Sequence, residues 1–351
     1  MTTASGGHVA ALHHVILRIA GWASDETIHT LRDWLAQNRT VDVARAALFT
    51  TFSNRIPVTR EDATTLADAA EEADVHDLLD LVPSPAFPYH IMSPMHPARH
   101  VHSGAGPHCL DLTGQPEEHD EIDRTAVEAA SDVAGFRGLW RAWRSPAFAT
   151  PWPPPRRVYL LQVAGEDQSR LPAYAAELQT ALERAGETHP QVEVFTDPES
   201  LPPYQRVALG WAALLATADP TPPIRIAGVF DAVDDTGGPG FSATHPTLDD
   251  GERDKVLGYL DAGTLILPTT AMMGDVLDDA RRPAVPMGFR SDGHWVWSDA
   301  TAYFLRRYRI APDPELLDHV RDRGHEAAPL GAVGMHRATA ALEAEGSDGD
   351  A

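Results

Sequence analysis

The spacing of apolar residues changes part-way along this chain, and that change constrains its fold more than any other feature. Over residues 9–82 apolar side chains recur three and four positions apart, as in amphipathic helices. Residues suited to helix N-caps precede three of these runs, namely Ser24, Thr40 and Thr59. One last short helix is indicated by Leu78, Leu79 and Leu81. We therefore predict a helical N-terminal bundle over 9–82.

Beyond residue 157 short apolar runs alternate with helical patterns. Strands are predicted over 158–163, 192–195, 224–230 and 264–267, and helices over 171–184 and 204–218. Because strands that alternate with helices favour parallel pairing, the predicted fold class is α/β, with α+β also possible. We expect residues 157–324 to form an α/β domain around a mainly parallel sheet.

The end of this predicted domain carries a hairpin signal. Asp292-Gly293 tolerates positive φ and separates two apolar runs, 285–290 and 294–297. Ser298 can cap the helix that follows, and Pro314 can open a last helix. The sequence thus predicts a C-terminal β-hairpin followed by helices.

The remaining segments lie between these predicted domains or at the C-terminal end of the chain. Residues 83–120 are rich in His, Pro and Gly and are predicted to form a long loop. Residues 121–144 are predicted to be a helix, and the Pro-rich stretch 145–156 a linker that marks a domain boundary. Beyond Gly324, residues 325–351 are predicted to be a small, acidic tail.

The charge of the chain restricts its partners. It has 51 acidic and 28 basic residues, so the formal net charge is −23. Such a field repels phosphate backbones and anionic lipids, which argues against nucleic acid or a membrane as partner. It favours encounter with a basic protein, although solubility alone also explains it. The longest apolar stretch, 207–218, is too short to span a bilayer.

The cysteine content and the N-terminus bear on localisation. Cys109 is the single cysteine, so no disulfide forms within the chain, and a reducing compartment fits. Residues 1–23 match a signal peptide poorly, because His13, His14 and Arg18 interrupt the apolar run. We therefore expect a cytoplasmic protein. The abundance of Ala, Gly, Pro and Arg suggests a GC-rich, actinobacterial-like bacterial genome.

Histidines cluster in the predicted loop over 83–120. The candidate metal ligands there are His96, His100, His102, His108 and Cys109. Imidazole and thiolate groups bind zinc and related divalent metals, so these residues could form the metal centre of a hydrolase. The alternative is a polar loop with solvated histidines. The spacing matches no standard zinc module.

A second group of candidates consists of carboxylates placed after predicted strands. They are Asp167, Asp197, Asp231 and Asp234. Ligands of open α/β sheets bind beyond the carboxyl ends of strands, and carboxylates suit Mg²⁺. Aspartate is also a common turn and cap residue, which is the alternative interpretation.

Motifs of several enzyme classes are missing from the sequence. There is no G-x-G-x-x-G fingerprint, no P-loop, no G-x-S-x-G elbow and no H-E-x-x-H motif. The sequence therefore gives no support to a dinucleotide-binding enzyme, a P-loop NTPase or a serine hydrolase of the common type, and catalytic residues stay unassigned.

The last candidate surface lies in the predicted hairpin. Asp292, Trp295 and Trp297 are candidate interface residues, because aromatic side chains are enriched in binding hot spots. Trp295 and Trp297 share one face of a strand, so they could equally belong to the core. The segment Phe289–Trp297, with its following aromatic-rich helix, resembles uncharacterised actinobacterial proteins and some bacterial immunity proteins.

These observations leave three functional hypotheses. The first is a non-catalytic protein-binding role, as an immunity-like or adaptor protein of a bacterial conflict or regulatory system, and it is motivated by the acidic charge and the missing catalytic motifs. The second is a metal-dependent hydrolase that binds zinc or another divalent metal through the histidine-rich loop or through the carboxylates placed after strands. The third is a regulator that senses a small molecule.

Overall fold

The chain forms two compact units, residues 1–219 and 220–351, which are described separately. The computed structural model describes residues 2–71, 90–99, 106–146, 153–165, 167–219, 222–234, 238–278, 280 and 283–348. Both units contain helices and strands, which confirms the predicted α/β or α+β class. No helix within these ranges is long and apolar enough to cross a membrane.

A six-stranded sheet forms the centre of the first unit. Its strands are β1 (His90–Ser93), β2 (Leu110–Asp111), β3 (Phe136–Pro146), β4 (Arg156–Val163), β5 (Gln191–Phe195) and β6 (Ala213–Thr217). The order is β2-β6-β3-β4-β5, and β1 also pairs with β3. Only the β2–β6 and β4–β5 pairs are parallel, whereas β3 is antiparallel to β1, β4 and β6. The sheet is therefore mixed, and the prediction of a mainly parallel sheet was wrong.

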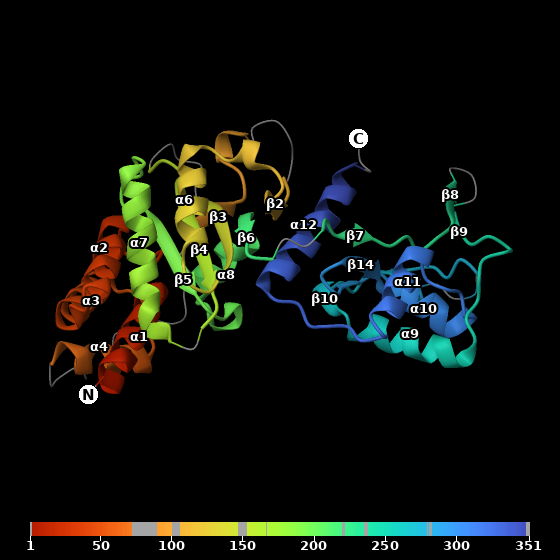
Figure 1. Cartoon of the computed structure of the whole chain (residues 1–351), viewed down its shortest axis with the longest axis horizontal. Helices are drawn as coiled ribbons and strands as arrows, with labels where there is room; N and C mark the ends of the chain where they lie inside the picture. Colours follow the sequence, from red (N-terminus) through yellow and green to blue (C-terminus); the bar gives the residue numbers. More distant parts are fainter. Residues whose placement is uncertain are drawn as a thin grey trace. The chain divides into compact units, whose positions relative to one another are not determined.

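Helices cover both faces of this sheet. They are α1 (Thr2–Ile19), α2 (Asp25–Ala36), α3 (Thr40–Asn54), α4 (Arg60–Ala70), α6 (Glu121–Ser131), α7 (Leu171–Arg184) and α8 (Pro203–Gly210), with single 3-10 turns at Pro97–Arg99, Pro116–Glu118, Gln168–Arg170 and Pro198–Ser200. Figure 1 shows α6 and α7 lying along the strands, and their apolar residues share one core with β3, β4 and β5. Strand residues alternate faces, so Glu193 points away from this core toward α2 and α8.

The N-terminal helices follow the predicted caps in part. Ser24 accepts a hydrogen bond from the Thr27 backbone N–H at the start of α2, and Thr59 forms a capping box with Asp62 at the start of α4. Thr40 is the first residue of α3 instead of its cap. The four helices belong to the same compact unit as the sheet, since α2 contacts α7 and β5, so they are not a separate domain.

Two predicted helices are helices only in their first part. The helix predicted over 121–144 ends at Ser131, and β3 begins at Phe136. Gly135 separates them with φ of +78°, and a Cβ there would lie 2.4 Å from the Ala164 carbonyl oxygen. Likewise, 204–218 divides into α8 and β6. A strand buried on both faces has a continuous apolar run, and spacing alone does not distinguish it from a buried helix.

The domain boundary also lies elsewhere than predicted. The Pro-rich stretch 145–156 connects β3 and β4, which are antiparallel neighbours in one sheet. It is therefore a connection within the first unit and not a linker between domains. The chain passes from the first unit to the second between positions 219 and 220 instead, where a second Pro-rich stretch begins in the sequence.

A four-stranded sheet organises the second unit. Its order is β10 (Thr264–Leu267), β13 (Phe289–Ser291), β14 (Trp295–Ser298) and β7 (Arg225–Ile226), and only the β14–β7 pair is parallel. Two small two-stranded sheets pair β8 (Ala232–Asp234) with β9 (Gly238–Gly240) and β11 (Met272–Met273) with β12 (Val285–Pro286). The helices are α9 (Asp250–Ala262), α10 (Asp299–Tyr308), α11 (Pro314–Asp322) and α12 (Ala332–Asp348).

The C-terminal hairpin and the helices after it agree with the sequence. Strands β13 and β14 form an antiparallel hairpin around Asp292-Gly293, where Gly293 has φ of +87°. Ser298 caps α10, and Pro314 opens α11. The predicted tail over 325–351 is different, because α12 occupies most of it and buries Ala338 against the unit.

Candidate functional site

The second unit contains an open pocket of about 420 Å³. Three elements supply most of its wall. Among the lining residues are Arg225 from β7, Trp295 from β14, and Glu315, Asp318, His319 and Asp322 from α11. A concave site with an aromatic wall and a few converging polar groups is the usual form of a ligand site.

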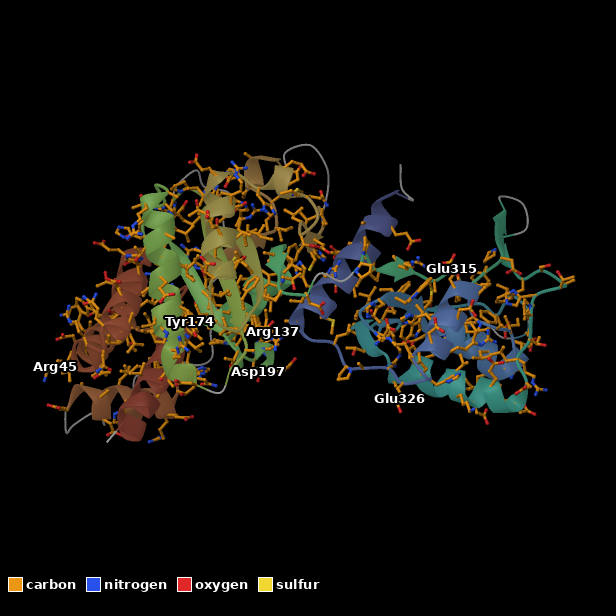
Figure 2. The ribbon with its side chains drawn as sticks, in the orientation of Figure 1. Arg45, Arg137, Tyr174, Asp197, Glu315 and Glu326 are labelled. Carbon is orange, nitrogen blue, oxygen red and sulfur yellow. The ribbon has the colours of Figure 1, made fainter. Side chains whose placement is uncertain are left out.

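Helix α11 presents this polar wall because its sequence is amphipathic. Asp313 caps the helix by accepting hydrogen bonds from two backbone N–H groups, and one face buries Leu316, Leu317 and Val320. The pocket residues occupy positions 315, 318, 319 and 322, which share the other face at the i, i+3, i+4, i+7 spacing. Figure 2 marks Glu315 on this helix. The acidic residues of this face are exposed.

The tryptophans of the hairpin lie inside the unit. Trp297 is fully buried, and its Nε1–H donates to the Leu260 carbonyl at 3.2 Å. Trp295 is buried too, although part of its ring lines the pocket, with the Arg225 guanidinium carbon 5.4 Å from the ring centroid. The predicted interface set is therefore core, apart from the pocket side of Trp295.

Asp292 positions His319 in the pocket. One of its oxygens, Oδ2, accepts hydrogen bonds from the Tyr259 hydroxyl and from His319 Nε2, the latter at 2.6 Å. Its other oxygen accepts from the backbone N–H groups of His294 and Trp295. Burial by itself raises the pKa of the Asp292 carboxyl, but these hydrogen bonds outweigh burial and hold the pKa below its ordinary value.

This arrangement also fixes which nitrogen of His319 carries the proton. Because the ionised Asp292 carboxylate only accepts hydrogen bonds, Nε2 is the protonated nitrogen of the neutral ring. Nδ1 then carries a lone pair, and within the described ranges no hydrogen bond is made to it. In this neutral form, His319 offers the pocket a hydrogen-bond acceptor at Nδ1.

The structure does not bring the predicted metal ligands together in the ranges it describes. The His96 ring packs against Trp143, and its Nδ1 accepts from the Ala98 backbone N–H at 3.2 Å. His108 packs against Trp211 with ring centroids 4.0 Å apart, and Cys109 is buried. His100 and His102 lie outside the described residues. No group of three or more His, Cys, Asp or Glu side chains suited to a metal occurs among the residues that are described.

The predicted carboxylate cluster is divided between the two units. Asp167 and Asp197 belong to the first unit, and each accepts a hydrogen bond from the backbone N–H two residues on, as turn and cap residues do. Asp231 and Asp234 belong to the second unit. Asp231 accepts from the Ser242 backbone N–H and bonds to His245, whereas only the backbone of Asp234 is described. Local roles thus explain Asp167, Asp197 and Asp231.

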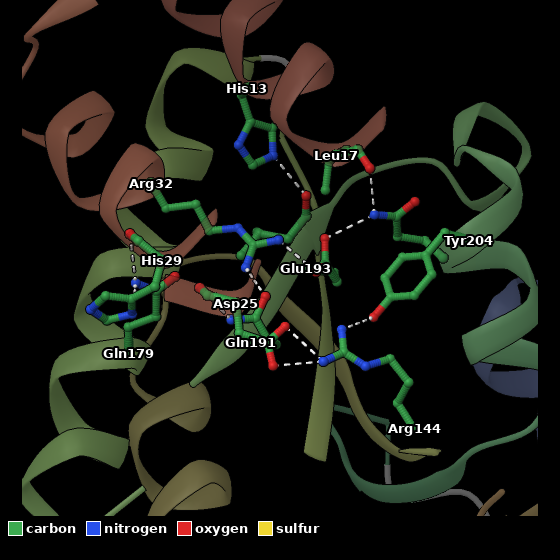
Figure 3. Close-up of polar contacts among 12 residues, drawn as sticks. His13, Leu17, Asp25, His29, Arg32, Arg144, Gln179, Gln191, Glu193 and Tyr204 are labelled. Atoms are coloured by element: carbon green, nitrogen blue, oxygen red, sulfur yellow. Dashed lines mark hydrogen bonds and ion pairs between the residues drawn. The ribbon is translucent and has the colours of Figure 1, made fainter. Parts of the chain in front are cut away.

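A network of buried polar groups in the first unit has no counterpart in the sequence predictions (Figure 3). Arg32 on α2 pairs with Glu193 on β5 at 2.5 Å, and both side chains are fully buried. The second Glu193 oxygen accepts from Gln205 on α8 at 2.9 Å. Nearby, Arg144 bonds to Asp25. Arg32, Glu193 and Gln205 are fully buried, so these three residues join α2 and α8 to the sheet inside the unit.

Comparison with protein-family models, with curated proteins and with solved structures found no match to this chain. Its fold and pocket define it as a two-unit protein of mixed helices and strands. The function must therefore be argued from the chemistry of the pocket.

Proposed function

We propose that this chain is a non-catalytic binding protein, an adaptor or immunity-like protein, whose second unit captures a cationic side chain of a basic protein partner. The observation that carries the proposal is that Glu315, Asp318 and Asp322 line the same pocket as Trp295. Carboxylates and an aromatic face are the two protein surfaces that attract a guanidinium or ammonium group.

The remaining groups of the pocket fit the same ligand. The neutral form of His319 offers a lone pair at Nδ1, because its Nε2–H donates to Asp292. The wall carries three carboxylates against one guanidinium, that of Arg225. The formal charge of −23 adds a long-range attraction that speeds encounter with a basic partner. Each of these features favours a hydrogen-bond donor with positive charge.

A catalytic role fits the lining less well. A histidine oriented by a carboxylate is the usual activator of a hydroxyl or thiol nucleophile. The described lining of the pocket contains no Ser, Thr or Cys side chain. The His319–Asp292 pair therefore has no side-chain nucleophile to activate there, and binding is the function that we propose. The metal-dependent hydrolase stays a separate prediction, which elemental analysis of the untagged protein tests.

Neutralising two carboxylates of α11 should weaken binding of a cationic ligand. The probe is a synthetic Gly-Ser peptide with one central arginine, titrated at low ionic strength and followed by NMR. The double variant Asp318→Asn/Asp322→Asn should bind it about 3- to 10-fold more weakly, because each exposed charge pair contributes roughly 0.2–1 kcal/mol. The difference should shrink as salt is added.

A matched control comes from α9. Asp254 is 69% exposed and paired with Arg253, much as Asp318 is 73% exposed and paired with Arg321. The double variant Asp250→Asn/Asp254→Asn neutralises two exposed carboxylates of α9 that do not line the pocket, and it should leave the affinity within about twofold. Equal weakening in both variants would assign the effect to net charge, and the proposed site would then be wrong.

The third hypothesis, a small-molecule sensor, is tested in the same titration. N-acetylarginine amide carries the guanidinium without a flanking chain. A partner-binding role predicts that the longer peptide binds more tightly, since peptide atoms extend beyond the pocket. Equal affinity for the two probes would favour the small-molecule regulator.

A further inference from the structure

Arg225 already fills the position in which the proposed pocket would hold a cation. Its guanidinium carbon lies 5.4 Å from the Trp295 ring centroid, and its Nη1 lies 2.5 Å from a carboxylate oxygen of Glu315. The chain thus contains an arginine that contacts both the aromatic wall and one carboxylate of the pocket.

The backbone of Arg225 is fixed, whereas its side chain is held weakly. Strand β7 pairs with β14, and the Arg225 backbone N–H donates to the His294 carbonyl at 3.0 Å. The side chains of Arg225 and Glu315 are 62% and 71% exposed. Exposed ion pairs and exposed cation–π contacts are each weak, so solvent or another cation can replace this contact without disturbing the strand.

We infer that Arg225 is an internal stand-in for the ligand, which an arginine side chain of the partner displaces from Trp295 and Glu315. This inference rests on the proposed function, and it narrows the ligand to a guanidinium. A planar guanidinium stacks on an aromatic ring and bonds a carboxylate in two places, which the ammonium group of lysine cannot do. Arg225 then lowers the affinity of the pocket for the partner.

The test is Arg225→Ala in the full chain, titrated with the central-arginine peptide and with matched peptides that carry lysine or citrulline. Removal of the internal competitor should tighten binding of the arginine peptide about 3- to 10-fold. The lysine peptide should bind the parent several-fold more weakly than the arginine peptide, and uncharged citrulline should not bind measurably.

Arg306→Ala is the matched control. Arg306 is 54% exposed and pairs with Asp261 on α9, away from the pocket lining, so this variant removes the same positive charge. Its affinity should change by less than about twofold. Arg225→Lys provides a second pocket variant that keeps the charge and the fold of β7, and its affinity should fall between the parent and Arg225→Ala.

The outcomes separate the two proposals. If the parent and Arg225→Ala both fail to bind the arginine peptide, the proposed function is overturned. If the parent binds and Arg225→Ala binds equally or more weakly, the pocket binds cations but Arg225 is not a competitor. If the parent binds a matched peptide with a central glutamate and does not bind the arginine peptide, the site is an anion site and both proposals are overturned.

Discussion

Replacing Arg32 by methionine is expected to lower the free energy of unfolding of the first unit by about 3–5 kcal/mol. Arg32 and Glu193 are both fully buried and lie 161 positions apart in the sequence. Without the guanidinium, Glu193 keeps only the hydrogen bond from Gln205, and its charge is left in a low-dielectric interior. This is the largest effect that we expect from a single substitution.

The measurement is urea unfolding of the full chain, followed by hydrogen exchange of peptides that cover α7 and β5, so that the first unit is observed separately. The double variant Arg32→Met/Glu193→Gln should recover part of the loss, because no unpaired charge remains. Arg39→Met is the control, since Arg39 is 43% exposed and pairs with exposed Asp42. A loss of less than about 1 kcal/mol for Arg32→Met would show that Glu193 does not depend on its partner.

Acidification from pH 6.5 to pH 4 is expected to destabilise the first unit through His13 by up to about 3 kcal/mol. Burial lowers the pKa of His13 from 6.5 to about 4, with a smaller lowering by Arg32, although the bond to the Val194 carbonyl opposes this. Between these values the unfolded chain binds a proton that the folded chain does not. Stability is therefore complete above pH 6.5 and falls until pH 4.

His13→Gln is the test variant, because a glutamine amide can still donate to the Val194 carbonyl but does not titrate. The difference in unfolding free energy between parent and variant should decrease as the pH falls through this window. His14 and His90 also have lowered pKa values, mainly through burial, and they act in the same direction in both proteins. A difference that does not vary with pH would contradict the assignment to His13.

Local signals in the sequence predicted local structure well. Ser24, Thr59 and Ser298 cap helices as expected, and Asp292-Gly293 turns the hairpin. Caps and turns depend on hydrogen bonds and dihedral preferences within a few residues, so the chain encodes them without reference to the rest of the fold. The helical spacing of Glu315, Asp318 and Asp322 is a local signal of the same kind. It predicts that these three carboxylates share one face of α11, which is the face that lines the pocket.

Sequence patterns whose meaning depends on burial in the folded protein predicted the structure less well. The middle of β3 and the start of β6 are buried on both faces, because helices cover both sides of that sheet. Their spacing therefore predicts helices, and the Pro-rich segment between β3 and β4 predicts a domain boundary where the structure has a connection within one sheet. Similarly, the site candidates chosen by residue type did not converge, since Asp167 and Asp197 serve local turns.

The sequence by itself determined the fold class, the acidic charge, most helix starts and the C-terminal hairpin. Only the tertiary structure decided the mixed strand order, the boundary at Pro220, the Arg32–Glu193 pair and the pocket of Arg225, Trp295 and α11. The physical reason is the distance along the chain over which each kind of interaction acts. Propensity and capping act over a few residues, whereas a buried charge finds its partner, and a pocket its walls, only when distant segments pack together.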